Sequence, residues 1–180
     1  MRLGVDVGSV RVGVAGCDPA GLIATPVETL RRGHDDVPRL AALVTERAAV
    51  EVVVGHPTTL RGTRGPAARA AEAYAATLAD RLGVPVRLVD ERFSTVGAQR
   101  GLHASGVDTR RGRSVIDQAA AVIILQGALD SERSSGRPPG RLVEPTARPD
   151  DRGEHATGDA SPGAEHDTAR DVEPSVEGER

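Results

Sequence analysis

The chain has 180 residues, enough for one ordinary domain. It contains 23 Arg, no Lys, one Tyr, one Phe and no Trp, and two aromatic rings are too few for the base-stacking surface of an RNA-recognition motif. The single cysteine excludes an intramolecular disulfide and a cysteine-based zinc site. The longest apolar run, residues 119–125, is too short to cross a membrane, and no secretion signal precedes the first apolar segment. These features predict a soluble, cytoplasmic protein.

The net charge of −3 is unevenly distributed along the chain. Residues 131–180 hold 12 acidic residues against 7 Arg, whereas residues 1–130 hold 14 acidic residues against 16 Arg. The C-terminal part is also rich in Pro and Gly and poor in large apolar residues, so it buries too little surface to offset the entropy of ordering. We therefore predict a folded domain over 1–130 and a disordered acidic tail over 131–180.

The folded part begins with three predicted strands. Arg2–Val7 and Val10–Gly16 alternate between apolar and small or polar residues, which indicates a β-hairpin around Gly8-Ser9. The turn sequence Asp18-Pro-Ala-Gly21 then leads to a third strand over 22–30. Helices and strands alternate afterwards, and the expected ranges are a helix over 37–48, a strand over 51–55, a helix over 66–82, a strand over 86–90, a helix over 94–104, a basic loop over 106–113 and an apolar helix over 114–129. This order predicts an α/β fold with a mixed sheet, three antiparallel strands first, and helices on both faces.

Three acidic positions stand out in this pattern. Asp6 lies in the first strand on the face opposite Leu3, Val5 and Val7, although a lone Asp before a hairpin turn is equally compatible with a structural role. Asp90 and Glu91 end the strand VRLVDE, where only one of them can share the face of Asp6, and either could instead favour the dipole of the next helix.

Asp117 lies one turn into the last helix, in VIDQAAAVIIL. Ser114 and Asp117 have the spacing of a capping box, which is the structural alternative. The apolar residues on the same face of the helix instead suggest that Asp117 faces the sheet. Three converging carboxylates repel one another and need cations, and an all-oxygen ligand set favours Mg²⁺ or Mn²⁺ over zinc.

Arginines and one Gly-rich segment are the remaining candidates for binding phosphate. Arg grips phosphate through two parallel hydrogen bonds, and several Arg lie near the acidic positions in sequence, although any single one could simply be solvated. Those expected to contact phosphate are Arg11, Arg92, Arg110, Arg111 and Arg113. The loop from Gly55 to Gly65 could cradle a phosphate at the start of the following helix, or could be a plain connection.

Four segments together resemble the YqgF/RuvX family in order and spacing. They are LGVDVGSVRVGVA, VVVGHPTTLRGTRG, VRLVDERFST and VIDQAAAVIILQGALD, and the match spans roughly residues 2–130. Two departures are visible: His56 and Thr58–Arg61 replace a family segment that usually reads VGLP followed by a polar loop, and Arg110, Arg111 and Arg113 stand where Lys is common.

The resemblance implies an RNase H-like fold and a metal-dependent nuclease related to Holliday-junction resolvases, acting in the cytoplasm on the 5′ end of the 16S rRNA precursor. It places the catalytic and metal-binding acids at Asp6, Glu91 and Asp117, with a two-metal mechanism using Mg²⁺ or Mn²⁺. The resemblance leaves open whether RNA or branched DNA is the main substrate. It also leaves open whether the protein is a monomer or a homodimer.

Two other functions are weighed against this one. An actin-like kinase shares the D-x-G-S start, but its two domains and adenosine pocket need more than about 130 ordered residues. A non-catalytic RNA-binding ribosome-assembly factor is the other alternative, and the presence of all three acids argues against it.

Overall fold

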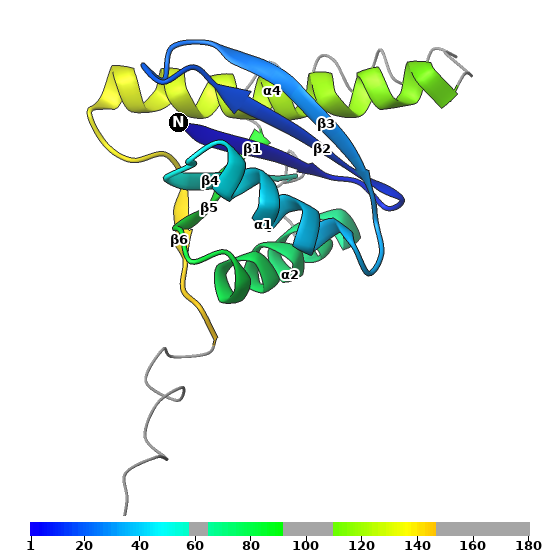
Figure 1. Cartoon of the computed structure of the whole chain (residues 1–180). Coiled ribbons are helices and arrows are strands. Elements are labelled where there is room, and N and C mark those ends of the chain that lie inside the picture. The colour runs from blue at the N-terminus through cyan, green and yellow to red at the C-terminus, as the bar shows by residue number, and fades with distance from the viewer. Residues whose placement is uncertain (58–64, 92–109, 147–180) are drawn as a thin grey trace, which may run out of the picture. The chain divides into compact units, whose positions relative to one another are not determined.

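The computed structural model describes residues 1–57, 65–91 and 110–146, with side chains from Asp117 onward in the last range (Figure 1). Met1–Arg148 form one compact unit. The strands are β1 (Arg2–Val7), β2 (Arg11–Cys17), β3 (Ala24–Arg31), β4 (Glu51–His56), β5 (Val86–Asp90) and β6 (Arg141–Val143), and the helices are α1 (Asp36–Glu46), α2 (Pro66–Arg81) and α4 (Arg110–Ser135).

The strands form one mixed sheet in the order β3-β2-β1-β4-β5-β6. β1, β2 and β3 are antiparallel, β4 and β5 run parallel to β1, and β6 is antiparallel to β5. Helix α4 covers one face of this sheet, and α1 and α2 lie on the other (Figure 1). The predicted α/β fold, a mixed sheet that begins with three antiparallel strands and carries helices on both faces, is confirmed.

The central strand β4 shows why an uninterrupted apolar run suits this position. Val52 and Val54 pack with Leu40, Tyr74 and other residues under α1 and α2, while Val53 packs under α4. Because successive side chains point to opposite faces, a parallel strand covered on both sides needs apolar residues at every position.

Helix α4 lies unusually close to the sheet because glycines face it. A Cβ placed on Gly4 would lie 2.6 Å from Cβ of Leu125, and a Cβ on Gly13 would lie 2.0 Å from the carbonyl oxygen of Asp117. The helix offers small residues in return, with Ala121 and Ala128 fully buried. The main chain of α4 is therefore held directly against β1 and β2.

The sequence placed both ends of α4 wrongly. Residues 110–113, predicted as part of a basic loop, form the first turn of the helix, which then continues past residue 129 to Ser135. Arg has a high helix propensity, so a run of Arg is compatible with a helix as well as with a loop. At the far end, Glu132 forms an ion pair with Arg2 of β1, a contact that local periodicity cannot reveal.

The predicted domain boundary near residue 130 falls inside α4, and the folded part continues beyond it. Strand β6 pairs with β5, and Val143 is buried in the core. Composition failed here because a three-residue edge strand contributes few apolar residues of its own. The tail beyond residue 146 and the helix predicted over 94–104 lie outside the described residues.

The third strand also begins later than predicted, at Ala24 instead of Leu22. The carboxylate of Asp18 accepts hydrogen bonds from the backbone N–H groups of Ala20, Leu22 and Ile23. These bonds hold the two apolar residues in the turn, and they lower the pKa of Asp18.

Tyr74 provides a test of the core under α1 and α2. Burial raises the pKa of its hydroxyl well above the ordinary value of 10.0, and the nearby Asp36 carboxylate adds to the rise. Since the native state keeps a proton that the unfolded chain releases above pH 10, stability should decrease as the pH rises above that value.

We expect the tyrosinate absorbance of the native protein to appear only together with loss of the helical circular-dichroism signal. The measurement is unambiguous because the chain has one Tyr. Tyrosinate forming near pH 10 in a protein that keeps its helical signal would contradict this burial.

Candidate functional site

Asp6 lies near the end of β1 on the face covered by α4. In the antiparallel pairing of β1 with β2, Asp6 lies opposite Gly13. Gly4, two residues earlier on the same strand, contacts α4, and strand alternation places Asp6 on that same face. The side chain of Asp6 is half-buried.

Glu91 directly follows β5 and shares this face. Its Oε1 lies 2.7 Å from the position that a Cβ on Gly55 would occupy, and Gly55 faces Ile124 of α4. Glu91 is only 5% exposed. Asp90 instead pairs in register with His56, and alternation turns it toward the α2 face. Of the two neighbouring acids, Glu91 is therefore the one on the side of Asp6.

Asp117 approaches the same region from α4. Its main chain rests on Gly13, the residue that pairs with Asp6. Its Oδ2 accepts a hydrogen bond from Nε of Arg11 at 3.0 Å, and both side chains are a little more than one quarter exposed. Arg11, the first residue of β2, thus lies beside a candidate catalytic acid and neutralises its charge.

The fold thereby brings Asp6, Glu91 and Asp117 from three separate elements to one face and one end of the sheet. Within the part of the chain that the structure describes, however, no three His, Cys, Asp or Glu side chains lie close enough together to hold a metal ion. The carboxylate of Asp117 is instead turned to Arg11. The oxygen donors suit Mg²⁺ or Mn²⁺, and a shared ion would require this ion pair to open.

The remaining predicted phosphate-binding residues are only partly described. Arg110, Arg111 and Arg113 lie in the first turn of α4, and their side chains lie outside the described set, as does Arg92. Of the Gly55–Gly65 loop, residues 58–64 also lie outside it.

His56, at the start of that loop, makes a contact that the sequence did not predict. Its Nε2 lies 2.9 Å from Oε1 of Glu72 on α2, on the face opposite the three acids. The 16-residue separation corresponds to no local motif, so only the fold could reveal it.

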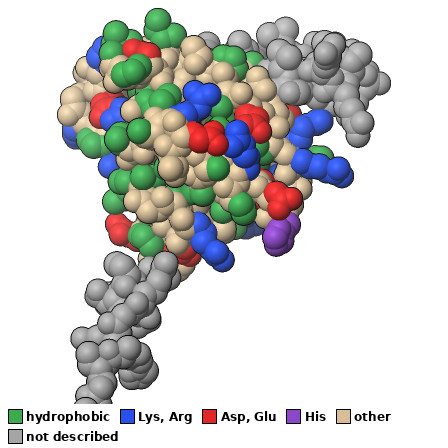
Figure 2. All heavy atoms as spheres, in the orientation of Figure 1, with side chains coloured by type: hydrophobic (Ala, Val, Ile, Leu, Met, Phe, Trp, Pro, Cys, Tyr) green, Lys and Arg blue, Asp and Glu red, His purple; other side chains and the backbone are tan. Residues whose placement is uncertain are grey.

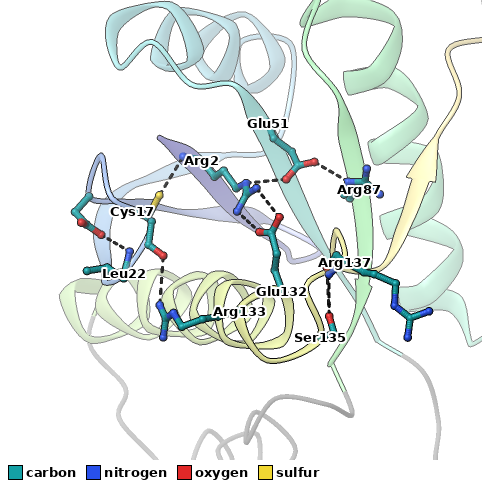
Figure 3. Close-up of polar contacts among 11 residues, drawn as sticks. Arg2, Cys17, Leu22, Glu51, Arg87, Glu132, Arg133, Ser135 and Arg137 are labelled. Carbon is teal, nitrogen blue, oxygen red and sulfur yellow. Dashed lines mark hydrogen bonds and ion pairs between the residues drawn. The ribbon is translucent and has the colours of Figure 1, made fainter.

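A second group of charges lies at the other end of the same face, and it is structural in character. Glu51 accepts ion pairs from Arg2 at 2.9 Å and from Arg87 at 2.6 Å, and Arg2 also contacts Glu132 of α4 (Figure 3). Each carboxylate here has an arginine partner, and the side chain of Glu51 is only 10% exposed. The group joins β1, β4, β5 and α4.

Other arginines are also neutralised by acidic partners. Arg39 pairs with Glu28 and Glu46, and Arg133 with Asp130. Arginines and acidic side chains are accordingly intermixed on the face seen in Figure 2. The excess of Arg in residues 1–130 therefore overstates the positive charge available to a ligand.

A pocket of about 230 Å³ borders Glu91. Val89, Ile124 and Pro139 give it apolar walls, and Ser131 supplies a hydroxyl.

Within the described residues, no helix is both long enough and apolar enough to cross a membrane.

Comparison with known proteins decides the family. The family model described as "RuvX: Holliday junction resolvase" matches residues 1–131. This chain belongs to the RuvX family.

A Streptomyces coelicolor protein named "Putative pre-16S rRNA nuclease" is 60% identical over 148 residues, covering 79% of this chain and 87% of the relative. A Thermobifida fusca protein of the same name is 55% identical over 154 residues, covering 81% and 97%. The resemblance noted in the sequence is thus confirmed, and this RuvX protein is a nuclease by family.

Among solved structures, the chain is similar to the Thermus thermophilus RuvC chain described as "in complex with Holliday junction substrate". The TM-score is 0.49 at 16% identity, with 79% of this chain and 98% of that chain covered.

Proposed function

We propose that this RuvX protein is a metal-dependent endonuclease that acts in the cytoplasm on the 5′ end of the 16S rRNA precursor. The names of its relatives support the substrate, and the gathering of Asp6, Glu91 and Asp117 on the α4 face supports the chemistry. The observation that carries the proposal is the contact of the Asp117 main chain with Gly13. Because Gly13 pairs with Asp6, this contact brings Asp117 of α4 next to the strand that holds Asp6.

Each acid has a separate part in this proposal. Asp6 on β1 and Glu91 after β5 supply oxygen donors from the rigid sheet, and Asp117 supplies a donor from the helix above it. Mg²⁺ or Mn²⁺, as one or two ions, would lower the pKa of the attacking water and stabilise the leaving oxygen. Arg11, Arg92 and the arginines of the first turn of α4 would position the strand through its phosphates without reading bases.

The test is cleavage of a transcript carrying the 5′ leader and start of 16S rRNA, with Mg²⁺ or Mn²⁺ present. We expect cleavage near the mature 5′ end, lost on chelation and weakened steeply by added salt because phosphate contacts dominate binding. A four-way DNA junction tests the alternative suggested by the family description. Cleavage of the junction alone would assign the protein as a resolvase, and binding of the transcript without cleavage would assign it as an assembly factor.

A further inference from the structure

We propose that Arg11 and a divalent cation compete for the carboxylate of Asp117, so that Arg11 serves as the counter-ion of the metal-free site. When the metal binds, the arginine releases Asp117 and its guanidinium becomes available to a substrate phosphate. This inference rests on the proposed function, since it assumes that Asp117 is a metal ligand. It makes Arg11 a positioning residue whose partner changes during the reaction.

The contact itself has the features of an exchangeable pair. Only Nε of Arg11 donates to Asp117, at 3.0 Å, and the two terminal nitrogens make no hydrogen bond to any residue that the structure describes. The pair is therefore not the bidentate arrangement that binds carboxylates most strongly. Both side chains are 27–28% exposed, so water and a hydrated ion can reach them.

The main chains on both sides of the pair are held in place. The carbonyl of Asp117 is against the Gly13 position, and Gly8 N–H donates to the carbonyl of Arg11 at 2.9 Å in the β1–β2 hairpin. We therefore expect the exchange of partners to proceed by rotation about the side-chain bonds of Arg11 and Asp117, while their main chains stay in place. Side-chain rotation of partly exposed groups is fast compared with enzyme turnover.

Comparison with Glu51 shows why the Asp117 pair is the one that can open. Glu51 has two arginine partners and is 10% exposed, whereas Asp117 has one arginine partner among the described residues and is 28% exposed. A single, partly exposed ion pair is weak. A divalent ion shared with Asp6 and Glu91 carries twice the charge of the guanidinium and would replace it.

The experiment measures Mn²⁺ affinity by calorimetry on the full-length protein without nucleic acid. We expect Arg11→Gln to bind Mn²⁺ about fivefold more tightly than the wild type, because the carboxylate no longer has to exchange partners. Arg31→Gln is the matched control: Arg31 pairs in register with Arg11 on the neighbouring strand, is exposed, and carries the same charge. Its effect should stay within twofold.

Two further variants make the result decisive. Asp117→Asn should weaken Mn²⁺ binding at least tenfold, and Arg11→Lys, which keeps the charge but not the Nε donor, should lie between wild type and Arg11→Gln. The rise in melting temperature on adding Mn²⁺ should follow the same order, which a purely structural role of Arg11 would not produce.

If Asp117→Asn weakens binding while Arg11→Gln matches Arg31→Gln, the competition is refuted and the proposed metal site stands. If neither the wild type nor any variant binds Mn²⁺, both the competition and the proposed metal site are refuted.

Discussion

Replacing Asp6 with asparagine is expected to reduce the rate of phosphodiester cleavage about a thousandfold (~4 kcal/mol in the barrier) without unfolding the protein. The substitution keeps the size of the side chain and removes the charge that a divalent ion would require. Asp6 lies on the strand next to Gly13, at the centre of the sheet, so the other two acids cannot take its place from α4 or from the end of β5.

The measurement is single-turnover cleavage of the precursor transcript at saturating Mg²⁺, with melting temperature as the check on folding. Asp35→Asn is the control, because its side chain is 96% exposed and lies before α1 on the other side of the sheet. We expect the control to cleave at the wild-type rate. Cleavage by Asp6→Asn within tenfold of that rate would remove Asp6 from the mechanism.

Adding a single methyl group at Gly13 is expected to lower the free energy of unfolding by about 3 kcal/mol. The new Cβ would lie 2.0 Å from the carbonyl oxygen and 2.5 Å from the carbonyl carbon of Asp117. Both are main-chain atoms, so no rotamer change relieves the clash, and α4 must move away from β2. That movement would also separate Asp117 from Asp6 and Arg11, and cleavage should fall with stability.

Denaturant unfolding of Gly13→Ala measures this effect, and Gly65→Ala is the matched control. Gly65 precedes α2 with an ordinary φ of −77°, and a Cβ there would meet nothing within 4 Å. Its substitution should change stability by less than about 1 kcal/mol. If Gly13→Ala were as stable as the control, the close packing of α4 on β2 would be refuted.

The sequence alone predicted the elements whose residues interact mainly with their near neighbours in the chain. Strand β5 was predicted with the bounds it has, and the apolar run Glu51–Gly55 was correctly placed as a buried strand. Alternation along β1 also predicted that Asp6 faces away from Leu3 and Val5, and the order of elements predicted the mixed sheet. Periodicity suffices in these cases because it depends only on which face of one element is buried.

Other features could be decided only by the tertiary structure. Local pattern could not choose between Asp90 and Glu91, because the choice depends on which face of β5 lies beneath α4 and beside Gly55. Local pattern also could not pair Arg11 with Asp117, which is 106 residues away in the chain. Residues 131–146 were assigned to the tail because their composition is polar, yet Glu132 and Val143 are held by partners on β1 and in the core. Composition and periodicity describe a residue by its neighbours in sequence, whereas the sheet order determines which distant residues become its neighbours in space.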